Sequence, residues 1–407
     1  MKSLKANSHS IYNFLKSLGK YSSLILVGMF TFPLATAQVS SKKLGDTSME
    51  TPISIGVLLP YQAQYLKQTE FTNLMLDYTT GFNMALEDMQ KSGFKFTALV
   101  DFWDTDPSDS LPGLQGPVYE KQLALQLNKK AYDILIGPVY EKSFQSYTSL
   151  INPKPHLWVS PLREIKITNG LPQVNLFMSD SLKPIAVAKT VVLTFPNHRH
   201  CIVTDGSSSA KKKGTIMETV LKKELKKGKN VSVHTYKNGV FTPPLPKKKD
   251  SLIISVCSED IKLRLPISKE IESAEINHSY VIGDISWFED SRFYTSQNQF
   301  NCLYPTINYV DIVDSSSIDF AQRFFKKNLA EPSKFAYIGY DQAKFLLNNF
   351  LMYNKHLEIA EKSRIEYGLI NNFSLSKSFT KFDDATWINA AVRLVRIDNN
   401  MSELFKP

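Results

Sequence analysis

The residues of this sequence best suited to chemistry are aromatic and polar side chains that directly follow short apolar runs. Tyr61 and Gln62 follow the run Ile53–Leu59, and Trp103 with Asp104 ends the next one. If such runs form parallel strands, their carboxyl ends share one edge of a sheet, where ligands bind in open α/β folds. We therefore expect a binding site whose first wall consists of Tyr61, Gln62, Trp103, Asp104, Val139, Tyr140 and Ser160.

The second half of the chain adds a smaller set of candidate side chains. Asp205 and Ser207 follow an apolar run at 201–204, and Asp284, Trp287 and Tyr340 are expected to close the far side of the site. Aromatic rings with a few polar groups suit a small-molecule ligand such as a sugar, a peptide or a cell-wall fragment better than a bare ion.

The same side chains also have a purely structural interpretation. Trp103 and Trp158 would be core residues, Tyr61 and Tyr140 would serve only stability at the rim, and Asp104 would belong to a turn. The sequence leaves both interpretations open.

Sequence signatures of catalysis are absent. The chain contains no Gly-x-Ser-x-Gly elbow, Walker loop, His-Glu-x-x-His or Cys-x-x-Cys motif. His198 and His200 alternate along one expected strand, but they lack further ligands at a metal-binding spacing. The three cysteines fit buried free thiols, with one disulfide as the alternative. We expect a non-enzymatic binding protein without cofactor or metal.

The elements that must position these residues alternate between strands and helices. Ile53–Leu59 is almost continuously apolar, as in a strand buried on both faces of a parallel sheet. Apolar residues then recur at helical spacing from Leu74 to Met89, before Gly93 ends the helix. Strands near 133–136 and 156–159, and a second series after residue 180, continue the alternation. The pattern predicts an α/β fold with two doubly wound parallel-sheet lobes.

The N-terminus predicts export. Residues 1–37 carry four lysines and no acidic residue, contain an apolar run at 24–32 and end in Ala35-Thr36-Ala37, the pattern of a signal-peptidase site. The alternative is an uncleaved membrane anchor, but the run is well short of the roughly 20 residues that span a bilayer. Because no cysteine lies near the cleavage site, we expect a soluble periplasmic protein rather than a lipoprotein, with residues 38–51 as a linker.

Residues 205–250 are the most basic part of the chain, with twelve lysines against four acidic residues. The lysines of region 211–249 either attract an anionic envelope polymer or form an ordinary solvated surface. Nucleic acid is not an expected partner for an exported protein.

The order of elements and several short motifs resemble the type I periplasmic binding-protein family, which includes the branched-chain amino acid ABC transporter substrate-binding proteins. The motifs are Ile55-Gly56-Val57-Leu58-Leu59-Pro60, Ala85-Leu86-Glu87, Ile136-Gly137-Pro138, Val159-Ser160-Pro161 and Tyr340-Asp341. The similarity is closer to envelope members in which such a domain often follows a peptidoglycan-binding LysM module. No LysM segment is seen between the expected cleavage site and the first strand.

The resemblance implies two lobes joined by three crossings, near 177–180, 305–311 and Tyr367, a hinge that would allow closure about a ligand. Lobe one would take residues 52–178 and 311–366, and lobe two residues 179–310 and 367–407. In amino-acid binding members a small hydroxyl residue closely follows the Gly-Pro of the third strand. Here that loop reads Val139-Tyr140-Glu141, and Leu162 follows Ser160-Pro161 where a small residue is usual. These departures argue against an amino acid as the ligand more than they argue against the fold.

Three functions follow from this resemblance. The first is a receptor that captures a small solute (an amino acid, peptide, sugar or cell-wall fragment) in a cleft between the lobes for a membrane transporter or a sensor. The second is an envelope regulator or scaffold of peptidoglycan synthesis that uses the same fold to contact a partner protein. The third is an enzyme with an unrecognised site, which the absence of catalytic motifs disfavours.

Overall fold

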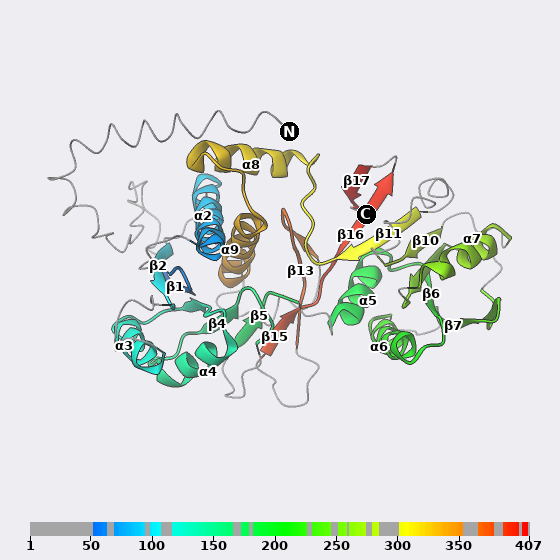
Figure 1. Cartoon of the computed structure of the whole chain (residues 1–407), viewed down its shortest axis with the longest axis horizontal. Coiled ribbons are helices and arrows are strands. Elements are labelled where there is room, and N and C mark those ends of the chain that lie inside the picture. Colours follow the sequence, from blue (N-terminus) through cyan, green and yellow to red (C-terminus); the bar gives the residue numbers. More distant parts are fainter. Residues whose placement is uncertain are drawn as a thin grey trace, which may run out of the picture.

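The computed structural model describes residues 52–62, 69–93, 98–106, 116–165, 172–178, 182–225, 230–245, 251–258, 260–273, 279–284, 301–352, 365–377, 386–398 and 401–405. Two sheets with helices on both faces form two lobes, at the left and right of Figure 1. We call the part around the 7-stranded sheet lobe one and the part around the 8-stranded sheet lobe two.

Lobe one is built around β1 (Ile53–Leu59), which pairs in parallel with β2 (Ala98–Asp104) and β3 (Ile134–Ile136). The parallel sheet continues through β4 (Leu157–Ser160) and β5 (Gln173–Asn175) to β15 (Thr386–Asn389), and β14 (Leu375–Lys377) adds an antiparallel edge. The intervening helices are α2 (Glu70–Lys91), α3 (Pro117–Leu127) and α4 (Glu141–Leu150).

Lobe two repeats this arrangement. After α5 (Lys183–Thr194), β6 (Arg199–Thr204) pairs in parallel with β7 (Val231–Lys237) and β9 (Leu252–Val256), followed by β10 (Ser279–Ile282) and β11 (Asn301–Thr306). Antiparallel strands extend both edges: β8 (Val240–Thr242) on one side, β16 (Arg393–Asp398) and β17 (Met401–Leu404) on the other. The helices include α6 (Ser208–Glu224) and α7 (Arg264–Ser273).

The two lobes share one strand order. It reads β2-β1-β3-β4-β5 in lobe one and β7-β6-β9-β10-β11 in lobe two. Each is the doubly wound order 2-1-3-4-5, whose direction reverses beside its first strand, and ligands bind at the carboxyl ends of the strands next to that reversal. The expected fold class, two doubly wound α/β lobes, is confirmed.

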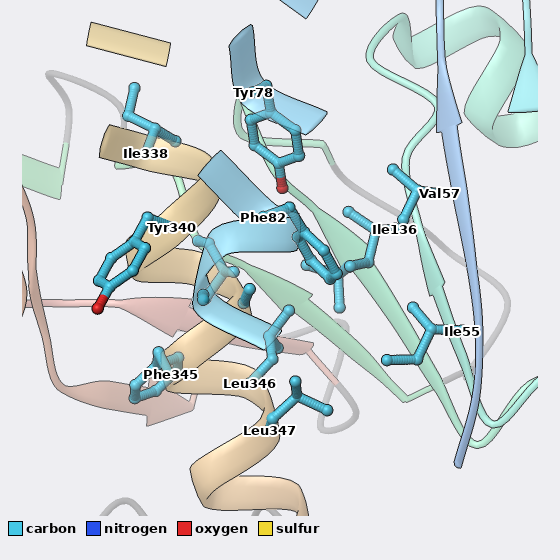
Figure 2. Close-up of a cluster of buried hydrophobic side chains, with 14 of the residues drawn as sticks. Ile55, Val57, Tyr78, Phe82, Ile136, Ile338, Tyr340, Phe345, Leu346 and Leu347 are labelled. Atoms are coloured by element: carbon cyan, nitrogen blue, oxygen red, sulfur yellow. The ribbon is translucent and has the colours of Figure 1, made fainter. Parts of the chain in front are cut away.

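The lobe-one core lies between the sheet and two helices, α2 and α9 (Lys334–Met352). Alternate residues of β1, Ile55 and Val57, meet Phe82 of α2 and Leu346 of α9 there (Figure 2). Outside this pair lies α8 (Ser315–Asn328), at the top of Figure 1. The opposite face of the sheet carries α3 and α4, with a second core around Trp158.

In lobe two, the alternation of β9 separates two cores. Ile253 and Cys257 face α5 and α6, whereas Leu252 and Ile254 face the side of α7. Because successive side chains of a strand point to opposite faces, Ser255 lies on the α5 and α6 side together with Ile253. Ser255 is therefore on the same face of the sheet as the helices α5 and α6.

The chain passes from lobe one to lobe two within 176–182 and returns within 307–314. A short hairpin, β12 (Glu366–Tyr367) with β13 (Asn372–Phe373), then precedes β14. The third crossing was expected near Tyr367, with all of 367–407 in lobe two, but it lies at 390–392. The reason is packing: β15 pairs with β5, and Leu375 and Trp387 are buried in the lobe-one core.

Two glycines let α2 and α9 touch through their backbones. A Cβ atom at Gly81 would lie 1.8 Å from the carbonyl oxygen of Ala336, and one at Gly339 would lie 2.1 Å from that of Tyr78. Neither oxygen can move without moving a helix. The hydroxyl of Tyr78 then donates to Gln342 Oε1 at 2.7 Å, which fixes the register of the two helices.

We predict that Gly81→Ala and Gly339→Ala each lower the free energy of unfolding by about 1–3 kcal/mol, because overpacking forces the helices apart. In a helix without such a close contact, glycine-to-alanine substitution would raise the free energy of unfolding by up to roughly 1 kcal/mol. The direction of the change in stability therefore tests whether the two helices touch at these glycines. Denaturant unfolding measures it. Asn73→Ala, at an exposed position of α2, serves as the control and should change stability by less than about 0.5 kcal/mol. Unchanged or increased stability of the glycine variants would contradict the close contact.

Candidate functional site

At the strand ends of lobe one, Asp104 organises a loop. Its Oδ1 accepts the N–H groups of Tyr61 at 2.9 Å, Gln62 at 3.2 Å and Asp106 at 3.0 Å. Gln62, held in the left-handed region at φ 52°, donates from Nε2 to Asp106 Oδ2 at 2.8 Å. The ring of Tyr61 is buried, and its hydroxyl lies 2.7 Å from Thr79 Oγ1. These contacts agree with the structural interpretation of Asp104 and Tyr61.

The remaining lobe-one candidates differ in exposure. Trp103 Nε1 donates to the hydroxyl of Tyr132 at 3.0 Å, Ser160 is buried and donates to the Arg163 carbonyl at 2.5 Å, and Val139 packs against the core. Tyr140 is 45% exposed where α4 begins. Tyr140 is therefore the candidate of this group whose side chain offers the most surface to a ligand.

Tyr340 lies away from these strand ends. Figure 2 shows it on the far side of α9 from Ile55 and Val57. Its hydroxyl donates to Asp88 Oδ2 at 2.8 Å, and Arg323 of α8 donates to both oxygens of the same carboxylate, also at 2.8 Å. Burial alone would raise the pKa of Asp88, but these hydrogen bonds hold it below its usual value. Tyr340 of α9 and Arg323 of α8 are thus both bonded to Asp88 of α2, which holds the three helices together.

Trp287 lies outside the described residues.

A cavity of about 380 Å³ opens at the carboxyl ends of the lobe-two strands. Its walls come from the N-terminal turns of α5, from Lys213 and Met217 in the middle of α6, and from the residues that end β9, β10 and β11. The lining residues are Lys183, Pro184, Val187, Lys213, Met217, Ser255, Val256, Cys257, Ser258, Ile282, Gly283, Asp284 and Pro305. Of the side chains proposed from sequence, Asp284 belongs to this lining.

Asp205 and Ser207 support the edge of the cavity. Asp205 Oδ2 accepts the hydroxyl of Ser258 at 2.5 Å, a bond that joins the ends of β6 and β9 across the point where the strand order reverses. Asp205 Oδ1 accepts the N–H of Ser207, and the Ser207 hydroxyl accepts the N–H of Ala210 to begin α6. Burial alone would raise the pKa of Asp205, but these hydrogen bonds lower it, so its carboxylate is charged at neutral pH.

Lys183, Lys213 and Ser255 are the lining residues that sequence reasoning missed. A signal was present for Lys183, since it begins α5 and the first turn of that helix contains no acidic residue, against the usual preference at helix N-termini. No comparable signal marked Ser255, a single hydroxyl within an apolar strand.

Cys257 contributes to the cavity as an apolar group. Burial raises the pKa of its thiol to about 12, with the nearby charge of Lys213 acting in the opposite direction. Cys201 and Cys257 are buried thiols outside any disulfide, as expected from the sequence.

Two lobes of order 2-1-3-4-5 joined by three crossings are the architecture that the sequence resemblance to type I periplasmic binding proteins implied. No protein-family model matches the chain, and no curated protein matches it. Within the described residues, no helix has the length and apolar character needed to cross a membrane.

Several solved structures are similar to the chain. Full-length LpoA from Haemophilus influenzae is 13% identical with a TM-score of 0.46, over 88% of this chain and 60% of that one. The chain therefore corresponds to 60% of the length of that LpoA. The LpoA C-domain, described as a regulator of PBP1A, is 12% identical with a TM-score of 0.45, over 87% of this chain and 100% of that one.

A third similar structure is an ABC transporter substrate-binding protein from Desulfitobacterium hafniense in complex with Leu. It is 14% identical with a TM-score of 0.37, over 87% of this chain and 100% of that one. Similarity at these identities concerns the fold alone.

Of the two histidines considered as metal ligands, His200 is buried and His198 is half-buried. No group of three or more potential metal ligands occurs among the described residues. Neither ring nitrogen of His200 has a hydrogen-bond partner in the described part of the chain. Burial lowers the pKa of His200 to about 4, and the charge of His198 acts in the same direction.

We predict that His200 makes the protein less stable in mild acid. Above pH 6.5 the residue is neutral in both folded and unfolded states. As the pH falls from about 6.5 to 4, the unfolded chain binds a proton that the folded protein excludes, so the free energy of unfolding decreases by up to roughly 3 kcal/mol. Denaturant unfolding at several pH values should show a shallower decrease for His200→Gln. At pH 8, where His200 is neutral in both states, the difference in unfolding free energy between parent and variant measures only the packing cost of the substitution. If the two proteins lose stability in parallel as the pH falls, His200 is not the residue responsible.

Proposed function

We propose that the chain is an exported, non-enzymatic binding protein that captures a small solute in the lobe-two cavity. The observation that carries the proposal is the cavity itself, about 380 Å³ at the carboxyl ends of β9 to β11. Its size is in the range of small-molecule sites, and its lining combines an apolar floor with a few polar groups, as such sites do. The proposed solutes are those expected from the sequence: an amino acid, a peptide, a sugar or a cell-wall fragment.

The chemistry of the lining favours binding over catalysis. The Ser258 hydroxyl donates to Asp205, whose lowered pKa makes its carboxylate a weak base for activating a nucleophile. The raised pKa of Cys257 keeps its thiol protonated at neutral pH. Histidine does not occur among the described residues that line the cavity. The side chains can orient a ligand, but none of them is prepared as a nucleophile.

Capture would be coupled to transport or sensing through the arrangement of the lobes. Three chain segments join them, and a multi-segment hinge permits one lobe to turn against the other when a ligand binds. The partner would be a membrane transporter or a sensor in the envelope, consistent with the export signal expected at residues 1–37. The lysines of region 211–249 offer an additional surface for an anionic envelope polymer.

We predict that one class of solute in a panel of amino acids, sugars and muropeptides raises the melting temperature of the purified protein. Binding to the folded state alone stabilises by about 2.7 kcal/mol at a ligand concentration 100 times the Kd. Val187→Phe should fill the cavity and abolish the shift, whereas Val240→Phe, the same change at an exposed position, should preserve it. A panel without any hit, or a hit that both variants bind equally, would count against the cavity as the site.

A second candidate function, the envelope regulator, is favoured by exposed apolar residues around α8. Leu329 is 83%, Ile312 75% and Val313 60% exposed, and Ile318 and Phe325 are exposed on the helix between them. Ile318 and Phe325 are seven residues apart and so lie on one side of α8. Apolar groups gathered in this way often mark a protein contact.

For this second function we predict that the double variant Phe325→Ser/Leu329→Ser loses capture of a detergent-solubilised peptidoglycan synthase, whereas Val187→Phe retains it. Both serine positions are exposed, so the folded protein should persist and melt as the parent does. Capture that depends on the cavity variant but not on the α8 variant would contradict the regulator.

A further inference from the structure

Ser255 carries a buried hydroxyl within an otherwise apolar strand of lobe two. The residue is 2% exposed, and its Oγ has no hydrogen-bond partner among the described residues. Its side chain lies on the α5 and α6 side of the sheet, where it lines the cavity beside Val187 and Met217. Buried polar groups are nearly always hydrogen-bonded, and a ligand in the cavity could supply the partner that the described residues do not give this hydroxyl.

The N-terminus of α5 meets the same cavity. This 12-residue helix has no side-chain cap at Leu182 and no acidic residue in its first turn, and Lys183 and Pro184 line the cavity. Pro184 has no N–H, but the remaining N–H groups of the first turn and the helix dipole favour a negative charge, and Lys183 is a cation at the end of the helix where an anion is the favoured charge.

Lys213 brings a second positive charge from α6. It lines the cavity one helical turn before Met217, and its charge acts on the thiol of Cys257. The floor beneath these groups is apolar, formed by Val187, Met217 and Ile282. The cavity therefore has a cationic, hydrogen-bonding end and an apolar body.

We propose that the cavity takes a small organic anion, whose carboxylate or phosphate is bound by Ser255, the N-terminus of α5 and the two lysines, and whose apolar part packs on Val187, Met217 and Ile282. This inference rests on the proposed function and narrows its ligand to one chemical class. Asp284, on the same lining, adds a place for a donor group of the ligand.

Calorimetric titration with three probes of similar size tests the inference: hexanoate, monobutyl phosphate and neutral 1-hexanol. We expect at least one anion to bind about 10-fold more tightly than hexanol, since charge-assisted hydrogen bonds exceed neutral ones in strength. The stronger of the two anions identifies carboxylate or phosphate as the recognised group. Equal binding of hexanol and both anions overturns the inference.

Two cavity variants and one control locate the anion. Ser255→Ala and Lys183→Gln should each weaken anion binding roughly 5- to 10-fold and leave hexanol binding unchanged, as loss of one charge-assisted hydrogen bond does. Lys212→Gln removes the same charge from an exposed position of α6 and should have no effect. Equal weakening by Lys212→Gln would show a nonspecific charge effect and overturn the assignment.

Stability provides a second readout. Without ligand, Ser255→Ala should melt no lower than the parent, because it removes a buried hydroxyl that lacks a partner. A lower melting temperature would show that the hydroxyl is bonded within the protein and would overturn the inference. If a neutral solute binds and Val187→Phe blocks it, while anions do not bind, the inference fails but the proposed function stands. If no solute or probe binds, both fail.

Discussion

Two buried charges of opposite sign hold one loop, and the whole connection between the lobes depends on it. The carboxylate of Asp341 accepts the N–H groups of residues 369–371 at 2.6–2.9 Å. The guanidinium of Arg393, 1% exposed, donates to the carbonyls of Gly368 and Leu369 at 2.6 Å. Burial raises the pKa of Asp341 and lowers that of Arg393, whereas the N–H donors of the loop and the charge of Arg393 favour the carboxylate, and the charge of Asp341 favours the guanidinium. Each charge is therefore less costly to bury in the presence of the other. A Cβ at Gly368 would lie 2.4 Å from Asp341 Cγ, which leaves no room for another residue.

This loop and its neighbours Asn372 and Asn389 are together hydrogen-bonded to all three crossings. Arg393 also donates to the carbonyl of Tyr309, whose own N–H donates to Ile370, and both bonds bind the second crossing. Asn372 donates to the carbonyl of Val392 at 3.1 Å, and Asn389 reaches the carbonyl of Leu176. The crossing segments therefore form one hydrogen-bonded unit rather than three independent linkers. Any turning of one lobe against the other has to occur about this unit, and a ligand can favour closure only by contacting the two states differently.

Much of the fold was predictable because its central strands are apolar on both faces. The continuous apolar run of Ile53–Leu59 indicates a strand buried on both faces, and the helical spacing of apolar residues after it indicates an amphipathic helix. A strand, a helix and a second strand in this order form a parallel pair joined by a crossover. The third crossing was predicted in the wrong place because strand periodicity does not say which sheet a strand joins. The sequence around Leu375 and Trp387 is equally compatible with a strand in either lobe. Only their packing in the lobe-one core shows which sheet these strands join. Contacts between residues far apart in sequence cannot be predicted from the local pattern of apolar and polar residues.

The candidate site was predicted only in part, for a related reason. Strand ends are readable from sequence, so Asp205, Ser207 and Asp284 were placed at the correct edge of lobe two. Tyr340 was misplaced because its partner Asp88 is 252 residues away in sequence. Ser255 was missed because a hydroxyl within an apolar strand becomes informative only when its surroundings are known. The features that conflict with local preference, an unpartnered hydroxyl in a core strand and lysine at the start of a helix, converge in one cavity. Such conflicts are costly to a fold, and their convergence is expected where a ligand, rather than the protein, completes the interactions.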